Sequence, residues 1–114
     1  MQSLRNQVQL IGNLGKDLEF KTVNEDLALA KVPIATNEFY KNGKGEKVQE
    51  TQWHNIVAWG KTAELMQSLL NKGDEVALQG RLVHRKYEDS NGQTKYITEI
   101  VVDQFVKLSR SETN

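Results

Sequence analysis

The stretch TQWHNIVAW, residues 51–59, decides the fold because its polar and apolar side chains are sorted between two faces with a period of two. Successive side chains of a β-strand point to opposite sides, so this period predicts a strand. One face would carry His54, Ile56 and Ala58, and the other Trp53, Asn55, Val57 and Trp59. The aliphatic Ile56 face suits a barrel interior, which leaves the two indoles on the outer face.

Other segments repeat the strand pattern. Residues 7–14, 27–35, 76–87 and 94–108 are also predicted strands, with Gly12 and Gly15 bending the first. Pro33 should sit at an edge, a bulge or a place where its missing amide hydrogen has no ladder partner. Residues 38–49 are too polar for a core and predict the tip of a long, mobile hairpin. Asn91-Gly92 predicts a second hairpin turn.

Helical spacing occurs at residues 61–72, where leucines and a methionine pair at i and i+4. Lys72 would lie in the last turn, with Gly73 just beyond the helix end. The predicted fold is therefore all-β: a five-stranded OB-fold Greek-key barrel with one short α-helix between strands 3 and 4. OB-fold barrels commonly bind oligonucleotides or oligosaccharides, and the fold does not choose between them.

Size and composition set broader limits. The chain has 114 residues, and we expect one OB-fold domain over residues 1–108 and a short, disordered polar tail at 109–114. Fifteen basic and fifteen acidic residues give zero formal charge, so a nucleic-acid partner would depend on local clustering. The start of the chain lacks an apolar signal segment, and we expect a cytoplasmic, nucleoid-associated protein.

Catalysis finds little support in the sequence. With no cysteine and only two histidines there is no thiolate nucleophile and no plausible zinc cluster. Gly60-Lys61-Thr62 imitates the end of a P-loop, but Asn55 stands where that motif needs glycine, inside a predicted strand. We therefore predict a binding protein that is not an enzyme and has no cofactor or metal.

Aromatic and basic residues alternate in several places. Tyr40, Trp53, Trp59 and Tyr87 lie on predicted strands or beside loops, flanked by polar or charged neighbours. A nucleobase stacked on such a ring is worth about 1–3 kcal/mol, so these rings could bind single strands without base-specific contacts. The alternative is that the indoles belong to the core, the usual place for large aromatics in a small barrel.

Cations gather beside the rings in Tyr40-Lys41 and Arg85-Lys86-Tyr87. Such interleaving suits a groove that follows a phosphate backbone while stacking its bases. For Lys44 and Lys47 a solvated loop is an equally good interpretation. Tyr96 is a weaker candidate, because it could pack across the hairpin against Tyr87.

Four separated motifs closely resemble the bacterial single-stranded DNA-binding protein (SSB) family. They are NQVQLIGNLGKD at 6–17, ATNE at 35–38, TQWHNIVAWGK at 51–61 and GRLVHRKY at 80–87. The resemblance runs from about residue 6 to residue 108. It implies an OB barrel, a homotetramer, and sequence-independent binding and protection of single-stranded DNA in replication, recombination and repair.

The resemblance also implies roles for individual residues. The stacking sites would be Tyr40, Trp53, Trp59 and Tyr87, and the phosphate contacts Lys61, Lys72, Arg85 and Lys86. The hairpin lysines Lys41, Lys44 and Lys47 join them as candidate DNA contacts. His54 resembles a family histidine at the subunit interface, and a satisfied core histidine is the alternative.

The sequence departs from its relatives in three ways. Gln7, Asn55 and Val83 are neutral where relatives often carry a cation, and residues 25–27 replace a Gly-rich stretch. Relatives usually continue into a long tail whose acidic, hydrophobic tip recruits replication and repair proteins. The residues at 109–114 have no such tip, so tip-dependent replication and repair partners cannot be inferred from them.

Two alternatives stay open at this point. A primosome-type OB protein would bind single strands but act mainly through helicase or primase contacts. An OB module that binds a sugar or other proteins is the third possibility.

Overall fold

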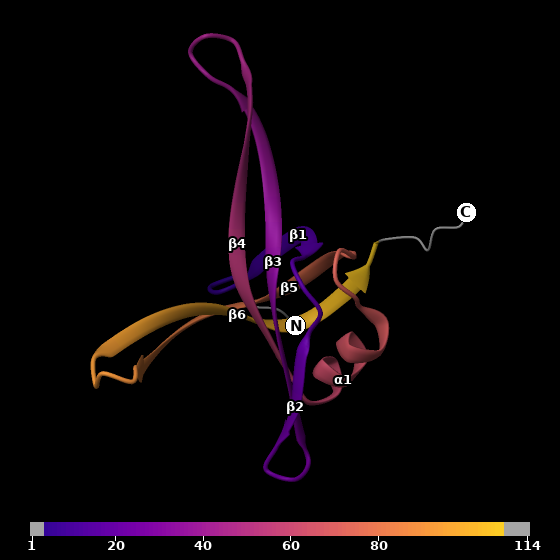
Figure 1. Cartoon of the computed structure of the whole chain (residues 1–114). Helices are drawn as coiled ribbons and strands as arrows, with labels where there is room; N and C mark the ends of the chain where they lie inside the picture. Colours follow the sequence, from indigo (N-terminus) through magenta and orange to yellow (C-terminus); the bar gives the residue numbers. More distant parts are fainter. Residues whose placement is uncertain (1–3, 109–114) are drawn as a thin grey trace.

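A computed structural model describes residues 4–108 and is built almost wholly of strands (Figure 1). In chain order the elements are β1 (Val8–Leu14), β2 (Glu19–Val23), β3 (Leu27–Lys41), β4 (Lys47–Trp59), α1 (Gly60–Leu69), β5 (Glu75–Glu88) and β6 (Thr94–Lys107). Within these residues no helix is long and apolar enough to cross a membrane.

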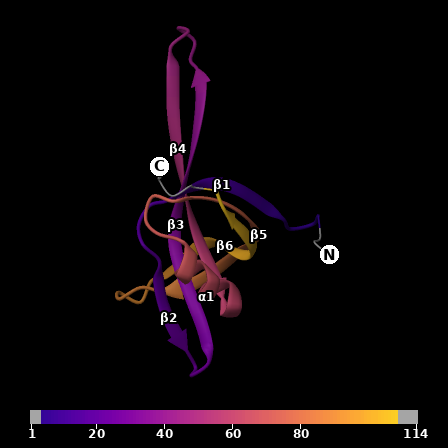
Figure 2. The same ribbon diagram turned by 90° about the vertical axis from the view of Figure 1, so that its right-hand side faces the viewer.

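Five of the strands close into a barrel. The sheet order is β1-β5-β6-β4-β3-β2, and a further pairing of β1 with β3 joins the two sides. Most neighbours are antiparallel, and β4 and β6 run parallel where Asn55 faces Glu99. Along the chain, α1 falls between the third and fourth barrel strands, which confirms the predicted architecture. Figure 2 shows the β3–β4 hairpin standing well clear of the barrel.

The core consists of the side chains that point into this barrel. Ile34, Ile56, Met66 and Val76 are its largest fully buried members. Ala58, on the same face of β4 as Ile56, is also fully buried, as the period-two pattern predicts. The inner face of β4 therefore forms part of the core.

β1 bends where it passes from one barrel neighbour to the other. It pairs with β5 as far as Asn13 and with β3 at Asn13 and Leu14. At Gly12 an added Cβ would overlap the Ala35 carbonyl, so glycine permits this close approach. The Pro33 carbonyl accepts a hydrogen bond from the Gly15 amide, 2.9 Å away. The backbone nitrogen and oxygen of a strand residue point to the same edge of the strand. The Pro33 nitrogen, which has no hydrogen, therefore faces the place between the β2 and β1 pairings of β3. No ladder partner is needed there, as predicted.

The β3–β4 hairpin is longer than the sequence pattern predicts. β3 extends to Lys41 and β4 starts at Lys47, so only residues 42–46 form the tip where 38–49 was expected. The Asn42 side-chain oxygen accepts amide hydrogens from Lys44 and Glu46 at 2.9 and 3.0 Å. This tight loop needs few residues, and polar residues on either side of it can stay in strands.

The β5–β6 tip is closed in the same way. The Asp89 carboxylate accepts the amide hydrogens of Asn91 and Gln93 at 2.9 and 3.0 Å. Gly92 has a φ of 79°, in the left-handed region where glycine has no Cβ penalty. The predicted turn at Asn91-Gly92 is confirmed.

β2 was not predicted from the sequence. Its five residues are charged or exposed for the most part and show no buried face. It is held by pairing with β3 alone, from Glu19 opposite Lys31 to Val23 opposite Leu27. Such a strand is stabilised by backbone hydrogen bonds to one neighbour. Its sequence therefore need not alternate between apolar and polar residues, and the period-two signal is absent.

The prediction for the end of the helix was wrong. α1 stops at Leu69, and Leu70 is already extended because its side chain turns into the core. Lys72 and Gly73 therefore lie in a loop and not in the last turn and cap. Their amides find other partners: Lys72 donates to the Asp17 carboxylate at 2.8 Å and Gly73 to the Leu14 carbonyl at 2.9 Å.

Candidate functional site

The outer face of β4 keeps its two indoles in solvent. Trp53 is 60% exposed and Trp59 is 43% exposed, while Val57 between them is buried. Tyr40 and Tyr87 are exposed by about half. The core alternative for the indoles is wrong, because the residues on the Ile56 side fill the barrel without them.

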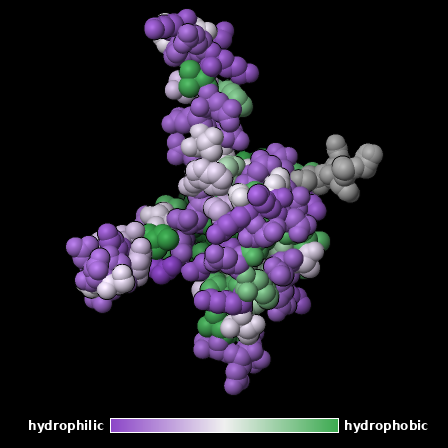
Figure 3. Space-filling model, viewed as in Figure 1, coloured by the Kyte–Doolittle hydropathy of each residue, from purple (hydrophilic) through white to green (hydrophobic). Residues whose placement is uncertain are grey.

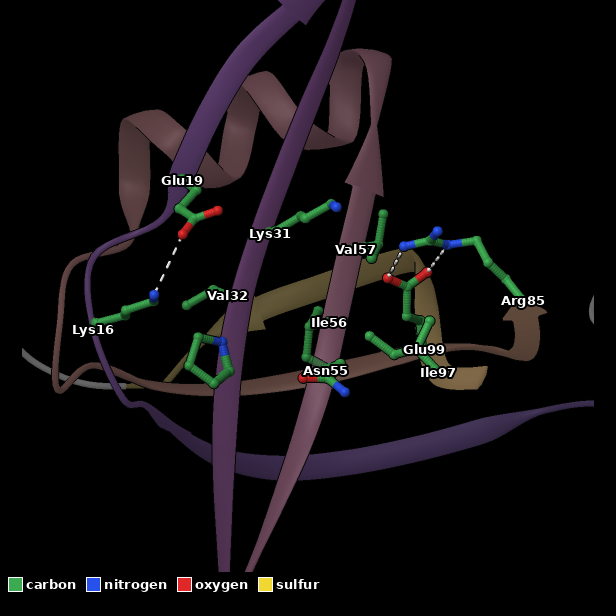
Figure 4. Close-up of a pocket in the computed structure, with 11 residues that line it drawn as sticks. Lys16, Glu19, Lys31, Val32, Asn55, Ile56, Val57, Arg85, Ile97 and Glu99 are labelled. Carbon is green, nitrogen blue, oxygen red and sulfur yellow. Dashed lines mark hydrogen bonds and ion pairs between the residues drawn. The ribbon is translucent and has the colours of Figure 1, made fainter. Parts of the chain in front are cut away.

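A basic groove lies beside Trp59 on the outer surface of β3, β4, β5 and β6. It has a volume of about 430 Å³, and its polar lining comprises Trp59, Lys31, Arg81, Arg85 and Glu99. Lys31, Arg85 and Glu99 also line an adjoining hollow of about 250 Å³, which reaches Asn55 and Lys16 (Figure 4). The two hollows form a continuous path over the outside of the barrel.

Two acids line this path: Glu19, which is exposed and ion-paired with Lys16, and Glu99. Among the described residues, Glu99 is the one charged residue that is buried, with 6% of its surface exposed. Its two carboxylate oxygens accept hydrogen bonds from Arg85, 3.1 Å from Nε and 2.9 Å from Nη2 (Figure 4). These hydrogen bonds, and then the charge of Glu99, raise the pKa of Arg85 above its ordinary value. The guanidinium is thereby fixed edge-on against the carboxylate.

Trp53 lies over the bend of β1 and lines a further hollow, which borders the path at Asn55. Its six-membered ring covers Gly15, where an added Cβ would overlap ring atoms. Pro33 is also near Gly15, on the far side of the same contact. The six-membered ring of Trp53 thus packs on the backbone of Gly15, and the rest of the indole stays exposed.

The β3–β4 hairpin carries aromatic rings on both faces. Its register pairs Ala35 with Trp53, so Phe39 falls on the Trp53 face and Tyr40 on the opposite face. Phe39 is exposed, and Lys47 Nζ lies 4.9 Å from its ring centroid. The sequence analysis did not select Phe39, although counting by twos from Trp53 through the hairpin register would have placed it there.

Strand alternation also separates the residues of the Arg85-Lys86-Tyr87 motif. Arg85 and Tyr87 share the groove face, whereas Lys86 points to the other face, opposite Tyr96. The suggestion that Tyr96 packs against Tyr87 was therefore wrong, since Tyr87 is opposite Lys95. Adjacent positions in a strand cannot serve one surface.

The remaining lysine candidates are spread over the molecule. Lys61 is exposed on α1 and Lys72 in the loop after it, and neither belongs to the lining of the basic groove. Lys41, Lys44 and Lys47 are exposed around the hairpin tip, where Lys41 pairs with Lys47. Both hairpin ends are strongly hydrophilic in Figure 3. Their roles as phosphate contacts stay predictions.

His54 is half-buried on the face of β4 opposite the indoles. Its Nε2 lies 3.0 Å from the Thr36 hydroxyl, so this ring nitrogen has a hydrogen-bond partner within the chain. It lines a third hollow together with Leu82, Tyr96 and also Trp53, and this hollow borders the path at Asn55. A place at a subunit interface stays a prediction for this residue.

Three groove residues escaped selection as site residues: Lys31, Arg81 and Glu99. Lys31 interrupts the apolar strand 27–35 on the face away from Ala30 and Val32, which was the available signal. Arg81 lies inside the motif at 80–87 but was given no role of its own. Nothing in the sequence around Glu99 indicated a site residue. Its role depends on which residue of β5 lies near it, and only the register of β5 and β6 determines that.

The sequence profile of the single-strand binding protein family matches residues 5–108. The chain belongs to this family. Among solved structures, an SSB of Plasmodium falciparum in complex with single-stranded DNA is 33% identical, with a TM-score of 0.85. The match covers 96% of this chain and 99% of that one.

A second family structure supports the fold alone. A deletion mutant of the single-stranded DNA-binding protein from Thermus aquaticus is 24% identical, with a TM-score of 0.80. The match covers 93% of this chain and 51% of the Thermus chain. The fold is thus the OB fold of SSB proteins: a closed five-stranded barrel with one helix, as predicted. The predicted polar tail at 109–114 lies outside the described residues.

Proposed function

We propose that this protein binds and protects single-stranded DNA without regard to sequence, in replication, recombination and repair. The observation that carries the proposal is the exposure of three rings, Trp53, Trp59 and Tyr87, of which Trp59 lines the basic groove. Membership of the single-strand binding protein family supports it, as does the likeness to an SSB solved with single-stranded DNA.

The chemistry of the groove suits unpaired strands. Each base has an aromatic face, so stacking on indole and phenol rings is tolerant of sequence and contributes about 1–3 kcal/mol per base. Lys31 and Arg81 present cations beside Trp59, where the phosphates of a stacked strand would pass. A duplex hides its base faces, so we expect it to bind poorly. The role is one of binding and not of catalysis.

A direct test is titration of the purified chain with oligo-dT and with a duplex of equal length. We expect oligo-dT to quench tryptophan fluorescence and the duplex to do so weakly. The logarithm of the affinity should fall with the logarithm of the salt concentration, with a slope of about 0.7 per neutralised phosphate. Absence of quenching and of binding at low salt would refute the function.

We further propose a homotetramer that resides in the cytoplasm at the nucleoid. The exposed hollow beside His54, with Leu82 and Tyr96, supports a contact with a second copy. Sedimentation of the free chain tests the assembly. A dimer that retains a helicase in pull-down experiments would instead favour the primosome-type alternative.

A further inference from the structure

Arg85 is oriented for a task other than gripping phosphate. An arginine binds a phosphate best when two parallel N–H groups face it. In this protein such an edge, Nε with Nη2, already faces the Glu99 carboxylate at 3.1 and 2.9 Å. A carboxylate of the protein thus occupies the position that a phosphate would take.

The Glu99 partner cannot easily be given up. Its side chain is 7% exposed, whereas the side chain of Arg85 is 44% exposed. If Arg85 turned to a phosphate, a buried carboxylate would lose its compensating charge, which is strongly unfavourable. The approaching phosphate would also be repelled by that carboxylate.

The ion pair with Glu99 uses two of the five N–H groups of the guanidinium and leaves its planar face and its Nη1 side for a ligand. A phosphate at the Nη1 side would meet a charge that the adjacent carboxylate already neutralises, whereas a base can still stack on the planar face. Arg85 lines the groove together with Trp59, and Tyr87 is the next residue on the same face of β5. Guanidinium planes stack on nucleobases in the way aromatic rings do. Held flat by Glu99, Arg85 lies in a series with two rings that are proposed to stack bases.

We propose that Glu99 is a positioning residue that withholds Arg85 from the phosphates and fixes it as a stacking surface for a nucleobase. The inference rests on the proposed function, because it assigns a role within the same groove. Because the pair is neutral as a whole, Arg85 contributes to affinity but not to the release of counterions. Lys31 forms no ion pair with a carboxylate among the described residues, and it serves as the comparison for an ordinary phosphate contact.

The test is the salt dependence of oligo-dT binding in the full chain and its variants Glu99→Gln, Arg85→Lys and Lys31→Ala. Glu99→Gln keeps the shape of the side chain and frees Arg85 to meet a phosphate. We expect its log–log slope to steepen by about 0.7, so that its advantage over wild type shrinks about 2.5-fold between 50 and 200 mM salt. Lys31→Ala should make the slope shallower by about the same amount.

Arg85→Lys keeps the charge and the ion pair but removes the planar group. We expect a loss of about fivefold or more in affinity with the slope unchanged, since base stacking is lost and counterion release is not. This variant retains a cation beside Glu99. If Glu99→Gln unfolds, Arg85→Lys therefore still tests whether the planar group is needed for binding. Circular dichroism of each variant checks the fold.

Two results would overturn the inference. One is a Glu99→Gln slope equal to or shallower than that of wild type, and the other is an Arg85→Lys variant that binds as tightly as wild type. In either case, normal binding by the wild-type chain and a shallower Lys31→Ala slope would leave the proposed function intact. Failure of the wild-type chain to bind oligo-dT would instead remove both.

Discussion

The two faces of β4 show how one segment serves folding and recognition at once. Ile56 and Ala58 point into the barrel and are almost inaccessible, whereas Trp53 and Trp59 point outward and stay exposed. The larger side chains are thus on the outside. Their exposure has no benefit for folding, which marks the outer face as a binding surface.

The largest effect should follow from a change on the inner face. Ile56→Ala leaves a cavity in a close-packed core and should lower the free energy of unfolding by about 2–5 kcal/mol. Urea denaturation measures this loss. Oligo-dT affinity should stay at the wild-type value under conditions where the variant is folded. A folded Ile56→Ala variant with weakened binding would show that the two faces are not independent.

The matching change on the outer face should give the reverse result. Trp53→Ala removes an exposed ring and should cost about 1–3 kcal/mol of binding to oligo-dT. The free energy of unfolding should change by less than about 1 kcal/mol, as is usual at the surface. Anisotropy of a fluorescent oligonucleotide measures the binding. Unfolding of this variant without a specific binding defect would place the indole in the structural core.

The sequence predicted this division well where local pattern was sufficient. Period two assigned both faces of β4 correctly, and the Asn91-Gly92 signal located a turn. It failed where a partner strand decides the outcome. β2 forms because β3 offers an edge from Leu27 to Lys31, and residues 38–41 remain in β3 because β4 pairs with them.

The candidate site was predictable in its residue types but not in its grouping. The rings that were predicted to be exposed are exposed. Lys86 and Tyr40, however, were grouped with residues that lie on the opposite face of their strands. Glu99 becomes relevant only when β5 and β6 are set in register, which brings its carboxylate to Arg85. Pairing between distant segments is not written in either segment alone.

The β3–β4 hairpin extends the comparison beyond the barrel, where neither face is buried. Phe39 continues the Trp53 face four strand residues past Ala35, or about 13 Å further along. We expect Phe39→Ala to weaken oligo-dT binding by about fivefold once the strand is long enough to span this distance. Tyr40→Ala should weaken binding only with still longer strands, which can cross to the opposite face.

A series of dT lengths measures the point at which each variant departs from wild type. Both variants should unfold at the wild-type temperature, since both rings are exposed. An effect of Tyr40→Ala at shorter lengths than Phe39→Ala would mean that the strand leaves the Trp53 face at the base of the hairpin.

The smallest effect should come from moving a ring without removing it. Gly15→Ala places a methyl group under the Trp53 ring, which must tilt away because the rest of the bend is fixed by pairing with β3. We expect the affinity for oligo-dT to fall by about twofold, less than the loss of a whole stacking contact. The tryptophan emission maximum of the free protein should also shift.

Gly43→Ala is the matched control, since the added methyl group at the hairpin tip meets no atom within 4 Å. It should change neither affinity nor emission. If Gly15→Ala shifts the emission but binds oligo-dT as wild type does, then Trp53 leaves Gly15 on binding, and the outer face of β4 is rearranged by its ligand. If it lowers affinity in proportion to the displacement of the ring, the position over Gly15 is the binding position, and the bend of β1 sets the orientation of an indole carried by β4.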